Sequence, residues 1–123
     1  MTNLLHTLTA NAALITFIFI TLDVVSGLMK GAAQSNLSSK IMRQGFWHKG
    51  SLFLVIVLAA AIDTAISSGL NIGFNAPIFE GTCIYIIGME TVSILENVVE
   101  MNPELKDSKL FALFRKNNDK EVE

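Results

Sequence analysis

Three long apolar blocks constrain this chain more than any other feature. They run from about Leu4 to Met29, from Ser51 to about Ser68 and from Pro77 to about Val99, and all nine Lys and Arg residues lie outside them. Eighteen residues of helix rise about 27 Å, close to the roughly 30 Å thickness of a bilayer core. The blocks therefore predict an all-α integral membrane protein with three transmembrane helices. A soluble three-helix bundle fits less well, because no block has the wide charged face that water requires.

The basic residues predict how these spans cross the membrane. Four of them accompany the polar segment Gly31 to Gly50, which we expect to be the first loop: Lys30, Lys40, Arg43 and Lys49. The other five follow the third block, whereas the turn from Gly69 to Ala76 carries no charge. Basic residues concentrate in cytoplasmic loops. We therefore expect the first loop and the C-terminus in the cytoplasm, with a three-span domain over residues 1–100 and a charged cytoplasmic tail over residues 101–123.

Composition and motifs exclude several classes of function. The chain has 123 residues, of which 51% are hydrophobic and 16% charged, and its formal net charge is -2. So small a charge gives no reason to expect a nucleic-acid partner. The sequence contains no phosphate-binding loop, dinucleotide fingerprint or metal-binding motif, and its carboxylates are too widely spaced to indicate a metal site. We therefore expect neither an enzyme nor a cofactor.

Each apolar block nevertheless contains an acidic residue: Asp23, Asp63 and Glu90. An aspartate at the centre of a membrane helix costs about 2.5 to 3.5 kcal/mol on insertion scales. No basic residue lies within the blocks, so these acids are expected to be protonated, hydrogen-bonded to neighbouring helices or in contact with water. An aqueous path satisfies them most simply. The candidate pore-lining or gating residues are Asp23, Asp63, Glu90, Ser93, Glu96 and Asn97.

The spacing of polar residues assigns faces to the first and third spans. In the first span, one face repeats every seven residues through Thr2, Thr9, Thr16, Asp23 and Lys30. The opposite surfaces suit lipid and carry Leu14, Phe17, Ile18, Leu22 and Val25. The third span has a polar stripe at three- and four-residue steps, formed by Glu90, Ser93, Asn97, Glu100 and Glu104. Such a stripe faces either a water-filled lumen or other helices that it binds without forming a pore. Gly27 and Gly31 form a Gly-x-x-x-Gly pair that favours close helix packing.

Several short motifs occur in a recognisable order. Leu22-Asp23 is followed by Gly27 and Lys30, then by Ser38-Ser39-Lys40, Gly45, Lys49 and Asp63, and finally by Glu90-Thr91-Val92-Ser93-Ile94-Leu95-Glu96-Asn97. The last motif is similar to a Glu-x-x-Ser-Ile-x-Glu-Asn signature. Together these motifs resemble the phage holin family that includes the toxin-secretion holins of clostridia. The resemblance covers roughly Leu22 to Leu105.

The resemblance implies a protein that oligomerises in the bacterial cytoplasmic membrane and opens lesions. Through these lesions a murein hydrolase, or in some relatives a toxin, leaves the cell. The implied partners are the lipid bilayer, further copies of the chain, and the hydrolase or toxin as a functional partner. We expect Asp23, Asp63 and Glu90 to be neutral while dry and to ionise as water enters. The residues alone leave two alternatives: a small ion or proton channel or transporter accessory subunit, and a structural membrane scaffold.

Overall fold

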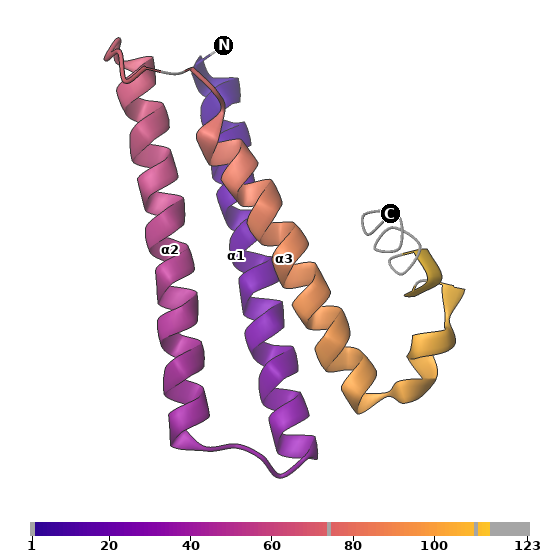
Figure 1. The fold of residues 1–123 in the computed structure, drawn as a ribbon. Helices are drawn as coiled ribbons and strands as arrows, with labels where there is room; N and C mark the ends of the chain where they lie inside the picture. The colour runs from indigo at the N-terminus through magenta and orange to yellow at the C-terminus, as the bar shows by residue number, and fades with distance from the viewer. Residues whose placement is uncertain (1, 74, 110, 114–123) are drawn as a thin grey trace.

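Three long helices form this protein in the computed structural model. The structure describes residues 2–73, 75–109 and 111–113, without the side chains of residues 2 and 4–9. The helices are α1 (Thr2–Ala33), α2 (Ser39–Ser67) and α3 (Ile78–Met101), followed by the short 3-10 helix η1 (Pro103–Asp107). Figure 1 shows α1 and α3 running in the same direction, with α2 antiparallel to both. No strand occurs in the described ranges.

All three helices are long enough and apolar enough to cross a membrane. They contain 32, 29 and 24 residues, which correspond to about 48, 44 and 36 Å of helix. Each length exceeds the roughly 30 Å of a bilayer core. The predicted all-α architecture with three candidate spans is confirmed, and the third block agrees with α3 to within two residues at each end.

The predicted first loop, Gly31 to Gly50, is wrong. Helix α1 continues to Ala33 and α2 begins at Ser39, so only residues 34–38 connect them. Ser38 is extended, and its side chain accepts a hydrogen bond from the Ile41 amide at 3.2 Å, which caps α2. Polar and basic residues do not end a helix by themselves, since Lys and Arg are good helix formers. Lys40, Arg43 and Lys49 are therefore helical residues of α2.

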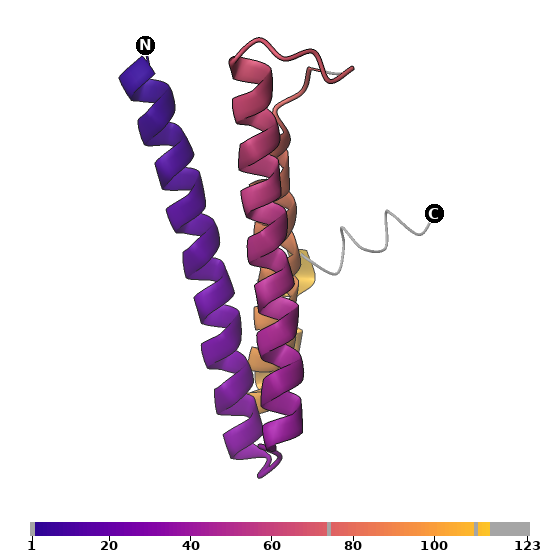
Figure 2. The ribbon, with the colours of Figure 1, turned by 90° about the vertical axis from the view of Figure 1, so that its left-hand side faces the viewer.

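Helix α3 is the common packing partner, since it contacts both α1 and α2. Figure 2 shows α1 leaning away from the other two helices towards its N-terminal end, and Figure 1 shows α3 diverging from α2 towards the C-terminal end of α3. The rings of Phe17 and Phe53 join α1 to α2 directly, with their centroids 6.0 Å apart. Of the most apolar stretch of each span, 11% is buried in α2, against 22% in α1 and in α3. Helix α2 is therefore the span held least by the rest of the bundle.

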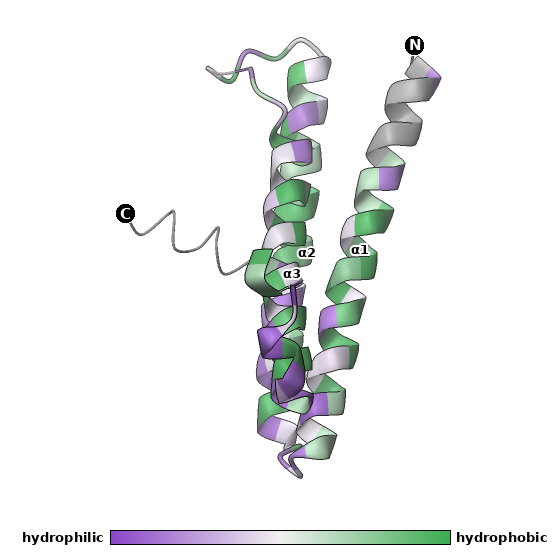
Figure 3. Ribbon diagram, turned by 90° about the vertical axis from the view of Figure 1, so that its right-hand side faces the viewer, coloured by the Kyte–Doolittle hydropathy of each residue, from purple (hydrophilic) through white to green (hydrophobic). Residues whose placement is uncertain are grey.

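The interior changes from apolar to polar along the bundle. Near the α2–α3 connection, Ala59, Phe79 and Cys83 form one buried cluster. Ile20, Leu52 and Ile86 form the next. Beyond them, towards the α1–α2 turn, the buried residues are polar: Asp23, Ser26, Glu90 and Asn97. Figure 3 shows hydrophilic residues gathering at this end of the helices. The polar end of the bundle therefore contains the candidate functional site.

The surface of α1 agrees with the faces predicted from its sequence. Thr16 and Asp23 are buried, while Thr2 and Thr9 fall among the side chains that the structure does not describe. The five residues assigned to lipid, Leu14, Phe17, Ile18, Leu22 and Val25, are 46% to 58% exposed. A surface this rich in exposed apolar side chains requires an apolar environment. The chain is a multi-pass membrane protein.

Candidate functional site: a charged cluster inside the bundle

A single lysine connects the acids of two other helices. The Lys49 ammonium group of α2 donates to the Glu90 carboxylate of α3 at 2.6 Å and also to the Asp23 carboxylate of α1. The exposed fraction of the side chain is 14% for Lys49, 2% for Glu90 and 10% for Asp23. Of the three alternatives expected for these acids, Asp23 and Glu90 follow hydrogen bonding to a neighbouring helix, and the donor is a lysine outside the apolar blocks. The sequence predicts a loop position for Lys49, but Lys49 is a helical residue of α2 and its side chain lies inside the bundle.

The three charged groups lie at the same depth in the structure. Asp23 is ten residues before the end of α1 at Ala33, and Lys49 is ten residues after α2 begins at Ser39. Glu90 is eleven residues before the end of α3 at Met101. At 1.5 Å per residue, each lies about 15 Å from the same end of the bundle. A layer of three charges therefore crosses the interior, which we call the charged layer (Asp23, Lys49 and Glu90).

The inward face of α2 explains why Lys49 reaches this layer. Steps of three and four residues place one side of a helix in a line, and such a line runs through Lys49, Leu52, Ile56, Ala59 and Asp63. Leu52 and Ala59 are buried, and Ile56 packs against both core clusters. The apolar members fix the rotation of α2, so its two charged members point towards α1 and α3 at different depths.

A second set of polar contacts joins α1 to α3. The Asn97 side-chain amide donates to the Asp23 carboxylate at 3.2 Å and to the Ser26 hydroxyl at 3.0 Å. Ser26 in turn donates to the Asp23 carbonyl at 3.1 Å. Within the part of the chain that the structure describes, every buried side-chain nitrogen and oxygen has a hydrogen-bond partner. The polar interior is therefore fully paired in this arrangement.

The polar contacts continue to the end of the bundle. Lys30 of α1 lies 3.3 Å from Glu100 of α3, and both side chains are substantially exposed. Ser93 is half-buried, whereas Glu96 and Glu104 are exposed. Three members of the predicted stripe therefore face the other helices, since Glu90 contacts α2 and Asn97 and Glu100 contact α1. Glu96, a candidate outside the stripe, is exposed. Whether any of these residues lines a pore remains a prediction.

Asp63 is far from the charged layer and has a different local role. Its two carboxylate oxygens accept hydrogen bonds from the backbone amides of Ile78 at 3.1 Å and Phe79 at 2.9 Å. These are the first two residues of α3, whose amides have no partner within the helix. A carboxylate at a helix N-terminus is also favoured by the helix dipole. Asp63 therefore caps the N-terminus of α3 and joins it to α2.

The remaining predicted residues also lie at different places in the bundle. A side chain added at Gly27 would lie 3.7 Å from the Asn97 amide, so Gly27 faces α3. At Gly31 the nearest atom is a Leu37 methyl carbon at 2.8 Å, so Gly31 faces the turn between α1 and α2. Lys40 and Arg43 are exposed on the first turns of α2. The pair of glycines thus packs on two different segments.

The charged layer has a net charge of -1 when all three groups are ionised. Electrostatic attraction is strong where water is absent, and it offsets the large cost of removing these groups from water. The described residues contain no group of three or more His, Cys, Asp or Glu side chains arranged to hold a metal ion. In this arrangement the charged layer joins α1, α2 and α3 through the ion pairs of one lysine.

Comparison with known proteins agrees with this picture of a small membrane protein. Residues 2–114 match the bacteriophage holin family. An uncharacterized protein of Clostridium perfringens, CPE0383, is 33% identical over 107 residues, covering 84% of this chain and 75% of the relative. An uncharacterized 14.9 kDa protein in the nagH 3′ region of the same species is 31% identical over 103 residues, covering 84% and 74%. Protein Lin0175 of Listeria innocua is 28% identical over 106 residues, covering 84% and 71%. No solved structure matches the chain.

Proposed function

Because this chain belongs to the bacteriophage holin family, a family of non-enzymatic membrane proteins, we propose that it oligomerises in the bacterial cytoplasmic membrane and permeabilises it. The lesions would release a murein hydrolase, leading to lysis, or a toxin. In this proposal the N-terminus is outside and the α1–α2 turn and C-terminus are cytoplasmic, as the distribution of basic residues predicts.

The observation that carries the proposal is the paired polar interior of an otherwise apolar unit. Asp23, Glu90 and Asn97 are buried among three helices that expose apolar side chains elsewhere. Polar groups of this kind are stable either when paired and dry or when in water. If α2 moves away, the polar faces of α1 and α3 become available to line a lumen shared by several copies. Helix α2 is the least buried span, so its departure exposes the least additional apolar surface.

In this proposal Lys49 is the residue that holds the bundle closed, a role that the sequence does not indicate. In a dry interior its attraction to Asp23 and Glu90 is strong, and entering water weakens it by raising the local dielectric constant. Each departure of α2 admits water, and water in turn weakens the contacts that hold α2. Opening is then self-reinforcing, as an abrupt permeabilisation requires. The closed form is held by ion pairs, in place of the neutral acids expected from the sequence.

Co-expression with a cytoplasmic murein hydrolase tests this proposal. Membrane potential, viability and culture turbidity are followed after induction of the chain with and without the hydrolase. We expect an abrupt loss of potential, with lysis only when the hydrolase is present. Loss of potential without release of folded protein would instead indicate an ion channel, and an undisturbed membrane would indicate a scaffold.

Matched variants connect the result to the charged layer. Lys49→Gln removes the ammonium group inside the bundle, whereas Lys40→Gln removes an exposed one from the same helix. We expect Lys49→Gln to change the time of permeabilisation at equal membrane abundance, while Lys40→Gln does not. If both variants permeabilise at the time of the unchanged protein, the charged layer has no part in opening.

A further inference from the structure

The charged layer holds one more negative than positive charge when its three groups are ionised. Asp23 and Glu90 are both acids, and the one ammonium group of Lys49 contacts them both. A buried charge without a partner of opposite sign is strongly unfavourable, because no water is present to stabilise it. The ion pairs therefore leave one unit of negative charge to be balanced.

The groups that surround the two acids do not balance this charge. The polar side chains packed around the carboxyl groups are all neutral: Ser26 of α1 and Ser93 and Asn97 of α3. Further charged groups are engaged elsewhere, since Lys30 contacts Glu100 and Asp63 accepts hydrogen bonds from the start of α3. His48, beside Lys49 in the sequence, is exposed.

The two carboxyl groups are direct neighbours. Both contact the same ammonium nitrogen, and they lie within hydrogen-bonding distance of each other. Two carboxyl groups that share one site resist ionising together, because their negative charges repel. One proton held between them removes this repulsion and brings the net charge of the layer to zero. A proton is also the smallest cation, so it needs no space beside the ammonium group.

A cavity connects this pair of acids to one end of the bundle. It has a volume of about 510 Å³ and lies between the second half of α1 and the first half of α2. Asp23 and Lys49 line its inner end, and Gln34 and Asn36 of the α1–α2 turn line its outer end. A water molecule occupies roughly 30 Å³ in the liquid and needs polar partners, which both ends of this cavity supply. Water that enters from the α1–α2 turn can therefore exchange a proton with Asp23.

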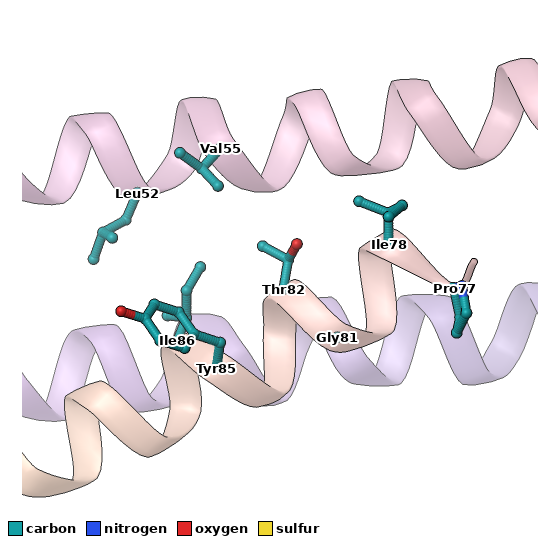
Figure 4. A pocket seen from close by; sticks show the side chains of 8 residues that line it. All are labelled: Leu52, Val55, Pro77, Ile78, Gly81, Thr82, Tyr85 and Ile86. Carbon is teal, nitrogen blue, oxygen red and sulfur yellow. The ribbon is translucent and has the colours of Figure 1, made fainter. Parts of the chain in front are cut away.

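The opposite approach to the charged layer is closed by apolar side chains. A second cavity, of about 440 Å³, lies between α2 and the first half of α3, and Figure 4 shows its lining residues from Pro77 to Leu52 and Ile86. None of the lining residues belongs to the charged layer. Leu52 and Ile86 form a buried cluster with Ile20, one helical turn from the charged layer on this side. The two cavities therefore predict access from the α1–α2 turn and not from the α2–α3 connection.

We propose that Asp23 and Glu90 together bind one proton, which enters through the first cavity from the α1–α2 turn. Asp23 lines this cavity and Glu90 does not, so the proton reaches Asp23 first and passes from there to Glu90. The protonated Glu90 carboxyl donates to the Asp23 carboxylate, while its other oxygen accepts from Lys49. The ion pair of Lys49 with Asp23 is retained, and the layer becomes neutral.

Proton binding gives the bundle a dependence on pH with a definite sign. Water stabilises ionised carboxyl groups, so the dry, closed bundle holds the proton more tightly than separated spans do. A rise of pH on the side of the α1–α2 turn therefore weakens the closed bundle. The proton site itself does not depend on whether the chain permeabilises membranes, so the two proposals can fail separately.

Infrared spectroscopy detects this proton directly, because a protonated carboxyl group absorbs at a different frequency from an ionised one. The full-length protein is reconstituted in phosphatidylcholine vesicles. Acids in contact with water are ionised at neutral pH, since their ordinary pKa values are about 4. We expect a protonated-carboxyl band that persists at neutral pH in the unchanged protein and disappears in alkaline buffer.

Three variants assign the band. Glu90→Gln and Asp23→Asn should each abolish it, because the single acid left behind pairs with Lys49 and ionises. Glu96→Gln removes an exposed acid of the same helix and should retain the band. Absence of the band in the unchanged protein would overturn proton binding. A band that survives Asp23→Asn would overturn the shared site, because burial of Glu90 alone would then account for its proton.

Two glycines test the route of the proton. Gly45 lines the first cavity and Gly81 the second, and a side chain added at either meets no atom within 4 Å. Gly45→Leu and Gly81→Leu therefore each fill one cavity without displacing its walls. In heavy water the band shifts as deuterium replaces the proton, and we expect this exchange to slow several-fold in Gly45→Leu but not in Gly81→Leu. Slower exchange in Gly81→Leu alone, or equal rates in all three proteins, would overturn entry from the α1–α2 turn.

Discussion

The ammonium group of Lys49 lies 2.6 Å from the Glu90 carboxylate, although 41 positions separate them in the sequence. The same ammonium group contacts Asp23, so one cation is shared by two anions on different helices. Such a cluster responds unequally to the removal of its members. Loss of one acid leaves a neutral pair, whereas loss of the lysine leaves two uncompensated carboxylates.

Lys49→Gln should therefore destabilise the protein far more than Glu90→Gln. Removing one partner of a buried ion pair costs about 3 to 5 kcal/mol, and we expect about 3 kcal/mol for Lys49→Gln but less than about 1 kcal/mol for Glu90→Gln. The free energy of unfolding is measured in mixed micelles by helix content against increasing dodecyl sulfate. Lys40→Gln is the control and should have little effect, as is usual for an exposed charge. Equal losses for Lys49→Gln and Glu90→Gln would contradict the shared-cation arrangement.

Asn97→Leu should weaken the packing of α1 on α3. The variant removes two hydrogen bonds, to Asp23 and to Ser26, and contacts of this kind between membrane helices average about 0.6 kcal/mol each. We expect a loss of about 1 kcal/mol in the same unfolding assay. Glu96→Leu changes the neighbouring exposed residue and should preserve or slightly raise stability. A larger loss for Glu96→Leu than for Asn97→Leu would reverse the assignment of inward and outward faces.

Asp63→Ala should loosen the start of α3 and leave the charged layer intact. Its carboxylate accepts from the amides of Ile78 and Phe79, and loss of a helix cap typically costs about 1 kcal/mol. Hydrogen exchange of these two amides should accelerate, while exchange near Glu90 stays unchanged. Ser67→Ala, at an exposed position near the end of α2, serves as the control. Unchanged exchange at Ile78 and Phe79 would show that Asp63 does not cap the helix in the membrane.

The predicted topology can be read from cysteine labelling. In a Cys83→Ser background, Asn36→Cys places a thiol in the α1–α2 turn and Ala76→Cys places one in the α2–α3 connection. We expect a membrane-impermeant maleimide to label the second variant in intact spheroplasts and the first only after the membrane is opened. The opposite pattern would show that the basic end of the bundle faces outward, against the positive-inside rule.

The sequence predicted most of the architecture and one face of α1 because both are local. Three apolar blocks predict three spans, and a seven-residue repeat places Thr16 and Asp23 on one side of a helix wherever that helix packs. The exposed residues opposite them, such as Leu14 and Phe17, confirm this reasoning. These inferences require knowledge of neighbours in sequence only.

The charged layer does not follow from the sequence, because its contacts are distant in sequence and the apolar pattern predicts too late a start for α2. His48 and Lys49 interrupt the apolar run, so the sequence predicts a second span that begins at Ser51, whereas α2 begins twelve residues earlier, at Ser39, after the capping residue Ser38. A usable signal was present: Lys49 continues the line of Leu52, Ile56 and Ala59 at three- and four-residue steps. Which acids Lys49 meets depends on how the helices pack, and no local pattern contains that information.

In the opening that we propose, the common depth of Asp23, Lys49 and Glu90 restricts how α2 can separate from its neighbours. If α2 slid along its axis by one turn, about 5.4 Å, the ammonium group would leave both carboxylates while all three groups stayed inside a low-dielectric interior. This axial movement separates the charges before any water can reach them, so it is the route with the highest free-energy cost. Tilting or rotation of α2 away from its neighbours lets water follow the charges as they part. The charged layer thus fixes the position of α2 along its axis relative to α1 and α3, and leaves tilting or rotation as the movement by which α2 can separate.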